Sequence, residues 1–96
     1  MGKLNLKISF DFLKSEKNQA IRGLSFTEAL KFEWRSAILI QDSRHDYGEA
    51  RYSAVGYIES RLHVLVFTPR EQIVHIISLR KADSREVAAY AQKTKS

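Results

Sequence analysis

The sequence predicts an α+β fold, a mainly antiparallel sheet with helices packed on it, in a single domain over residues 1–96. The first observation is that three apolar runs follow one another between residues 51 and 80, joined by the hairpin-length links 59–61 and 69–71. The second is that capped helical patterns stand before and after these runs. The predicted order is therefore β-α-α-β-β-β-β-α, with the helices expected on one face of the sheet.

The first predicted element is a strand over residues 3–10. Its apolar residues alternate with polar ones in a period of two, at Leu4, Leu6, Ile8 and Phe10. Asp11 then predicts a helix N-cap, because its carboxylate can accept a backbone N–H at the positive end of the helix dipole. This helix should run to about Ile21 and end at Gly23, a residue suited to the left-handed C-cap conformation.

Ser25 and Glu28 have the spacing of a capping box, which predicts that a second short helix begins there. The helix should end near Trp34, because Phe26, Ala29 and Leu30 repeat at helical spacing. The two helices, joined by a glycine turn, would form an αα-hairpin. Residues 37–40 are a short apolar strand, and 41–50 are a polar loop.

The three strands of the meander are expected at residues 51–58, 62–68 and 72–80. The last two are nearly continuous apolar runs, so they should lie centrally in the sheet. Asp83 and Glu86 again have the spacing of a capping box, which predicts that a final helix begins there.

The composition limits the classes of function. A net charge of +5, from 16 Lys and Arg against 11 Asp and Glu, suits a polyanionic partner such as nucleic acid, although an ordinary cationic surface gives the same count. The chain has no cysteine, so no disulfide can form, which fits a cytoplasmic protein. It has no apolar stretch of the ~18 residues that a membrane span needs, and the N-terminus lacks the apolar segment of a signal peptide.

The usual catalytic motifs are missing from the sequence. It has neither a glycine-rich phosphate loop nor a nucleophile elbow. Its three histidines, His45, His63 and His75, lack the spacing and the partners of a zinc site. We therefore expect neither a cofactor nor a metal ion.

The basic pair Arg80-Lys81 is the most informative feature for function. It ends an apolar strand, and Asp83 begins a helix almost at once. Two cations repel one another and the positive end of the helix dipole, so a bound anion would stabilise them. Asp83 and Glu86 can also supply that negative charge alone.

The cations, histidines and one tyrosine together suit one metal-free reaction, the cleavage of RNA by attack of its own 2′-hydroxyl. That reaction needs a general base, cations around the phosphorane and an acid for the leaving 5′-oxygen. Histidine titrates near neutral pH, and the arginine fork matches phosphate oxygens. The candidates are Arg51, His63, His75, Arg80, Lys81 and Tyr90.

These candidates also have ordinary explanations. His75 alternates with apolar residues and can be a partly buried sheet residue. Tyr90 shares a helical spacing with apolar residues and can be a packing ring. Arg51 can simply pair with Glu49 or Asp46.

The strand geometry restricts which candidates can act together. His75 and Arg80 have opposite parity, so in a regular strand they face opposite sides of the sheet. They share a site only if a β-bulge intervenes or if Arg80 lies beyond the end of the strand. The helix start at Asp83 favours the second geometry.

Four separated blocks of the sequence carry a resemblance that covers about residues 7 to 90. They are Phe10-Asp11-x-x-Lys14-x-x-x-Asn18, Arg22-Gly23-Leu24-Ser25-Phe26-x-Glu28-Ala29, Arg51-Tyr52-x-x-x-Gly56 and Ile76-Ile77-Ser78-Leu79-Arg80-Lys81-Ala82-x-x-Arg85-Glu86-x-x-x-Tyr90. In their order and spacing, these blocks closely resemble the BrnT family. The resemblance implies a RelE-like α+β ribonuclease toxin of a bacterial type II toxin–antitoxin pair, which inhibits translation and growth. It also implies a BrnA-like antitoxin, usually with a ribbon-helix-helix domain, that neutralises the toxin and represses their shared operon.

The resemblance also implies roles for individual residues. Arg51 and Arg80 would bind the scissile phosphate, Lys14 would bind a neighbouring phosphate or stabilise charge, and Tyr90 would stack on a base or move a proton. Four further candidates do not rest on the resemblance. His75 could act as the base or bind phosphate when protonated, and Glu49 is a second possible base. Arg22 and Lys81 are expected to contact RNA.

Three positions differ from the family pattern. Phe10 stands where Trp is usual, Ile21-Arg22 stands where Lys-His is usual, and His75 stands where Arg is frequent. The missing histidine before Gly23 keeps a second hypothesis open, a catalytically degenerate module that binds nucleic acid and antitoxin in operon repression. A third hypothesis is a small protein with an unrelated structural role.

Overall fold

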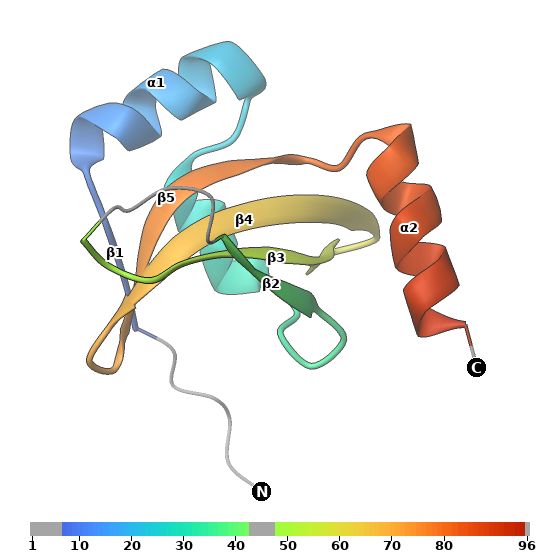
Figure 1. Ribbon diagram of the computed structural model, residues 1–96. Helices are drawn as coiled ribbons and strands as arrows, with labels where there is room; N and C mark the ends of the chain where they lie inside the picture. The colour runs from blue at the N-terminus through green and yellow to red at the C-terminus, as the bar shows by residue number, and fades with distance from the viewer. Residues whose placement is uncertain (1–6, 43–47, 96) are drawn as a thin grey trace, which may run out of the picture.

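The structure is a computed structural model that describes residues 7–42 and 48–95 (Figure 1). Its elements are β1 (Lys7–Phe10), α1 (Phe12–Arg22), the 3-10 helix η1 (Phe26–Lys31), β2 (Ile38–Asp42), β3 (Arg51–Ile58), β4 (Arg61–Arg70), β5 (Ile73–Lys81) and α2 (Ser84–Thr94). This is the predicted order. The part of the predicted first strand before Lys7, and loop residues 43–47 with His45 and Asp46, lie outside the described residues.

A five-stranded sheet in the order β1-β5-β4-β3-β2 forms the centre of the molecule. The strands β3, β4 and β5 are an antiparallel meander, and β2 adds to it antiparallel to β3. The N-terminal strand β1 returns to pair with β5 in parallel. The prediction that the two most apolar strands lie centrally is confirmed, because β4 is the middle strand and β5 has neighbours on both sides.

The two faces of the sheet carry separate apolar clusters. On one face, Phe26 of η1 packs in a cluster with Leu65 and Leu79. On the opposite face, Tyr90 of α2 packs with Leu62 and Val64 of β4, the strand that also carries Leu65. The expectation that the helices share one face is therefore wrong. Since β4 presents apolar side chains on both faces, each face needs a cover, and η1 and α2 supply one each.

A β-bulge in β5 changes which of its residues share a face. Opposite the step from Val66 to Phe67 in β4, β5 has one extra residue, Ile77. The extra residue shifts the alternation, so His75 and Arg80 project from the same face of the sheet. The geometry favoured from the sequence is wrong, because Arg80 still lies inside β5.

Helix α1 begins and ends as predicted. Asp11 accepts the Lys14 N–H at 3.1 Å as the N-cap, and Gly23 ends the helix with a φ of 74°. Midway along α1, the Asn18 amide donates to the carbonyls of Leu24 and Leu79, at 2.8 and 2.9 Å. The pairing of β1 with β5 stops at Ile76, so the rest of that edge of β5 has no strand beside it. The bond from Asn18 to Leu79 holds α1 along this part of β5.

The second helix is shorter and tighter than predicted. It is a 3-10 helix that ends at Lys31, before Trp34. The tight turn brings the Thr27 N–H to the Ser25 hydroxyl at 3.2 Å, and Glu28 pairs with Lys31 at 3.2 Å. The predicted Ser25–Glu28 capping box is therefore wrong. The box at the start of α2 is confirmed, with both of its hydrogen bonds at 2.9 Å.

Gly56 allows β3 to approach the segment that follows η1. A Cβ atom at this position would lie 2.7 Å from the Phe32 ring. No helix among the described residues is long and apolar enough to cross a membrane.

Candidate active site

A row of polar residues crosses the sheet on the same face as α2. Helix α2 covers only the opposite end of this face. Asp42 pairs with Arg51 in register, and Ser9 pairs with His75. Thr68 of β4 lies between Arg51 and His75. It pairs with His75 on one side, and on the other side it follows Phe67, which pairs with Tyr52, the residue after Arg51. Since partners in register point to one face, the side chains of Asp42, Arg51, Thr68, His75 and Ser9 form one line. We call this line the polar row.

His75 is the titratable base in the polar row. Its Nδ1 lies 2.7 Å from the Ser9 hydroxyl, which fixes the imidazole and leaves Nε2 for other partners. Its pKa is lowered from the usual 6.5, first by partial burial and then by the charges of Arg70 and Lys14, against the opposing effect of Glu49. A neutral imidazole at pH 7 can accept a proton.

Glu49 and Arg70 form a bidentate ion pair at the same end of the sheet, with the Arg70 Nε and Nη2 at 2.8 and 3.0 Å from the two carboxylate oxygens. The Arg70 hydrogen bonds, with the charges of His75 and Arg51, hold the pKa of Glu49 below its usual value. Glu49 is therefore a weak proton acceptor, and its evident effect is to orient the Arg70 guanidinium. Arg51 lies half-buried between this pair and β2.

Lys14 approaches this group from α1. It lies in the first turn of the helix, directly after the end of β1, and its charge acts on the pKa of His75. The structure therefore brings together four of the residues proposed from the sequence, Lys14, Glu49, Arg51 and His75, and adds Arg70. We call these five the active-site group.

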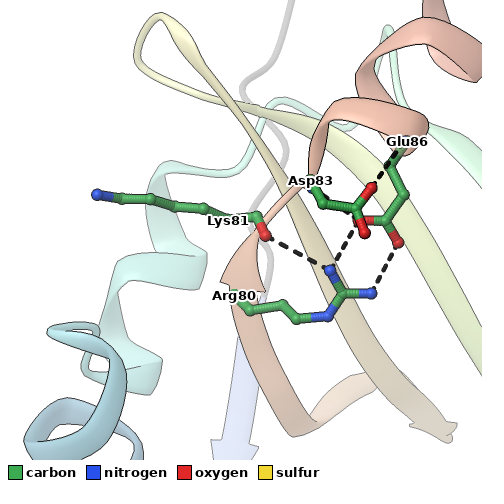
Figure 2. Close-up of polar contacts among 4 residues, drawn as sticks. All are labelled: Arg80, Lys81, Asp83 and Glu86. Carbon is green, nitrogen blue, oxygen red and sulfur yellow. Dashed lines mark hydrogen bonds and ion pairs between the residues drawn. The ribbon is translucent and has the colours of Figure 1, made fainter.

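Arg80, the first choice from the sequence, lies elsewhere. Its row is four residues along β4 from the His75 row, about 13 Å away at the usual rise of a strand. Its guanidinium is turned toward Glu86 (Figure 2). The Arg80 Nη1 and Nη2 each lie 2.7 Å from a Glu86 carboxylate oxygen. The Arg80 hydrogen bonds lower the pKa of Glu86 to about 2, and Glu86 also accepts the Asp83 N–H. A carboxylate of the following helix, and not a bound anion, therefore supplies the negative charge beside Arg80.

Tyr90, Lys81 and Arg22 are also separate from the active-site group. The Tyr90 ring is 8% exposed, packs edge-on against Tyr57 and donates its hydroxyl proton to the Ser36 carbonyl at 2.7 Å. Its environment is that of a packing ring. Lys81 is exposed and points away from the Arg80 cluster (Figure 2). Arg22 lies exposed in the last turn of α1.

Sequence reasoning missed Arg70 and Ser9. Arg70 falls in the predicted hairpin link 69–71, but β4 continues to it, and only the fold shows that it reaches Glu49. Ser9 belongs to the polar side of the predicted first strand, and its place beside His75 depends on the parallel pairing of β1 with β5. The alternation in that strand was the signal that could have drawn attention to Ser9, because it placed Ser9 opposite in parity to the core residues Ile8 and Phe10.

Comparisons with known proteins identify the family of the chain. A family model described as the ribonuclease toxin BrnT of type II toxin–antitoxin systems matches residues 10–86. The chain belongs to the BrnT family. The match contains the active-site group and both residues of the Arg80–Glu86 pair, so the family resemblance seen in the sequence is confirmed.

A solved BrnT structure has the same fold. The crystal structure of the Brucella abortus ribonuclease toxin BrnT is 26% identical, with a TM-score of 0.67 over 83% of this chain and 100% of that chain. It confirms the α+β class and the mainly antiparallel sheet. Among curated proteins, no sequence matches the chain.

Proposed function

We propose that this BrnT-family toxin is an endoribonuclease that cleaves RNA without a metal ion, using the active-site group. The observation that carries the proposal is the polar row, in which His75 and Arg51 project from one face of the sheet beside the Glu49–Arg70 pair. A neutral imidazole and three cations in one place match the base and the phosphate ligands that the reaction needs.

The proposed reaction begins with proton transfer from the RNA 2′-hydroxyl to His75 Nε2. The 2′-oxygen then attacks phosphorus, and the bond from phosphorus to the 5′-oxygen breaks. Arg51 and Arg70 bind the phosphate oxygens, because a guanidinium keeps its protons and offers a fork of donors. Lys14 is the remaining acid of the group and gives a proton to the leaving 5′-oxygen. The products are a 2′,3′-cyclic phosphate and a 5′-hydroxyl end.

In this proposal, Arg80 and Tyr90 hold α2 in place and do not touch the substrate. Support comes from their partners, since the Arg80 guanidinium is bound to Glu86 and the Tyr90 hydroxyl to the Ser36 carbonyl. Glu49 orients Arg70, and Ser9 positions His75.

The product ends test the proposed chemistry. Purified protein is incubated with end-labelled RNA in the presence of EDTA, and the products are analysed for cyclic phosphate and 5′-hydroxyl ends. The matched control is Arg85→Ala, which removes an exposed cation of α2. We expect cleavage by the unmodified protein and by the control. Cleavage that needs added divalent metal, or that leaves 5′-phosphate ends, would contradict the mechanism.

The proposal includes a partner and a location. We infer that a BrnA-like antitoxin binds and neutralises this toxin in the cytoplasm, that it carries the DNA-binding domain through which the complex represses its operon, and that it belongs to the same operon. Co-expression with the product of the adjacent reading frame should restore the growth of cells that express the toxin. If growth stays arrested although the two proteins are made at equal levels, this partner assignment is wrong.

A second candidate is a non-catalytic module that binds RNA and antitoxin. It is favoured by the engagement of Arg80 and Tyr90 in contacts within the protein, which leaves two of the residues expected from the family resemblance without access to substrate. This candidate predicts RNA binding that weakens with salt but produces no cleavage.

A further inference from the structure

A groove of about 270 Å³ lies between α1 and β5, outside the active-site group except for one shared residue. Its floor is formed by Phe26 of the core and by Ile77, the extra residue of the bulge. Its outer wall is one side of α1, where Lys14, Lys17 and Arg22 stand along the helix.

The groove is strongly cationic. Lys14 and Lys17 are three positions apart and point to one side of the helix, whereas Glu16, two positions from Lys14, points to the opposite side. Over residues 7–42 and 48–95, no ion pair involves Lys14, Lys17 or Arg22. Three cations that line one groove, and that form no ion pair within the described part of the chain, favour a polyanion.

The groove joins the active-site group at Lys14, whose charge acts on the pKa of His75. From Lys14 to Arg22, α1 rises eight residues, which is about 12 Å and enough for roughly two nucleotides of extended single strand. A chain of phosphates leaving the proposed site can therefore follow the cations of α1. The exposed side chain of Ile21 lies between them and offers an apolar contact to a base.

We propose that the groove between α1 and β5 binds the RNA backbone next to the cleaved phosphate, through Lys17 and Arg22. The inference rests on the proposed ribonuclease function and assigns the groove as a binding subsite for the flanking nucleotides. The phosphate contacts act through charge, so the subsite contributes to affinity without selecting a base sequence.

The test compares two double variants with the same loss of charge. Lys17→Ala with Arg22→Ala removes the groove cations, whereas Arg85→Ala with Lys95→Ala removes two exposed cations at α2. Cleavage is measured on an RNA of about eight nucleotides, in line with common single-strand site sizes, and on a dinucleotide. Thermal unfolding of each variant checks that its fold is kept.

For the groove variant, we expect KM on the longer RNA to rise about tenfold with kcat unchanged, since two exposed charge contacts are lost. The dinucleotide should be cleaved equally well by both variants, because it does not reach the groove. The slope of log affinity against log salt should become about 1.4 less steep for the groove variant. Equal KM for the two double variants, or an equal loss on both substrates, would overturn the inference.

Failure of the proposed function can be separated from failure of the subsite. A 2′-deoxy oligonucleotide of the same sequence lacks the attacking hydroxyl, so its binding is measured without cleavage. If the unmodified protein cleaves no RNA but the groove variant alone weakens this binding, the ribonuclease proposal fails and the groove stands as a nucleic-acid site. Binding that is equal in both variants means that the groove serves another partner, such as an acidic protein segment, and overturns the inference.

Discussion

His75 is the residue on which the proposed chemistry depends most. Ser9 holds one ring nitrogen at 2.7 Å, and burial with nearby cations lowers the imidazole pKa. We predict that His75→Ala lowers kcat for RNA cleavage by about 10²–10⁴, the usual contribution of a general base. The thermal midpoint should change little, because the ring lies in the polar row and not in the core. The change in kcat is measured under single-turnover conditions, and Arg85→Ala serves as the control.

The pH dependence follows from the lowered pKa of His75. The folded-state pKa lies below 6.5, so most of the imidazole is neutral at pH 7. It becomes protonated as the pH falls through this lowered pKa. We predict that kcat/KM rises with pH through an inflection below 6.5 and is level at pH 7. Ser9→Ala, as a change in a positioning residue, should move this inflection while KM stays the same. An inflection above 6.5, or one that persists in His75→Ala, would show that another group is the base.

The arginines differ in what their partners leave them able to do. Arg70 is held by Glu49 at the exposed end of β4, where it can still offer donors to a phosphate, whereas Arg80 is bound at both terminal nitrogens by Glu86. We predict that Glu49→Gln lowers kcat less than Arg70→Ala, because the amide still accepts a hydrogen bond from the guanidinium. A loss with Glu49→Gln as large as that with His75→Ala would make Glu49 the base.

At the scale of elements, α2 is held by few polar contacts. The main ones are the Arg80–Glu86 pair, the Asp83 cap and the Tyr90 hydroxyl bond to Ser36. The side chains of Arg80 and Glu86 are 34% and 29% exposed, so solvent weakens their attraction. We predict that Arg80→Ala lowers the free energy of unfolding by about 1 kcal/mol. Urea unfolding of Arg80→Ala, Glu86→Gln and the double variant should show that the two losses are not additive.

The same pair makes stability depend on pH. The folded-state pKa of Glu86, about 2, lies below its usual value of 4.5, so this contribution is fully present above pH 4.5 and is lost as the pH falls toward 2. In Glu86→Gln this part of the acid dependence should disappear. An unchanged acid unfolding curve for Glu86→Gln would contradict the assigned pair.

Gly56 allows close packing of β3 against Phe32, which follows η1. A methyl group at this position would come 2.7 Å from the buried Phe32 ring, so the ring or the strand would have to move. We predict that Gly56→Ala lowers the free energy of unfolding by about 1–3 kcal/mol. Ser60→Ala, at the exposed turn of the next hairpin, is a suitable control for denaturant unfolding.

The order of helices and strands could largely be predicted from the sequence, whereas the active-site group could be predicted only in part. Apolar runs and turn lengths predicted the meander, and Asp11, Gly23 and Asp83 predicted helix ends, because these signals act within a few residues. The bulge at Ile77 and the parallel pairing of β1 with β5 depend on contacts between distant segments, and they decide which face His75 and Ser9 share. The sequence leaves open whether Asp83 and Glu86 satisfy the basic pair, and the fold shows that the Glu86 carboxylate holds the Arg80 guanidinium.

At the scale of the whole molecule, the sheet separates two tasks. The active-site group lies where β3 and β5 begin, where β4 ends and where α1 follows β1, and the opposite end of the sheet is covered by α2 through the Arg80–Glu86 pair (Figure 1). The net charge of +5 supports attraction of RNA to the molecule as a whole. Expression of the chain alone should therefore arrest growth, and the arrest should be relieved by His75→Ala although the protein is still made.

The most direct test of this account is the single-turnover cleavage rate of His75→Ala beside that of Arg80→Ala, with both proteins shown to be folded by circular dichroism. The account predicts a loss of about 10² or more for His75→Ala and a rate within a few-fold of the unmodified protein for Arg80→Ala. The reverse order, with Arg80→Ala folded but inactive and His75→Ala active, would contradict it and place the chemistry beside α2.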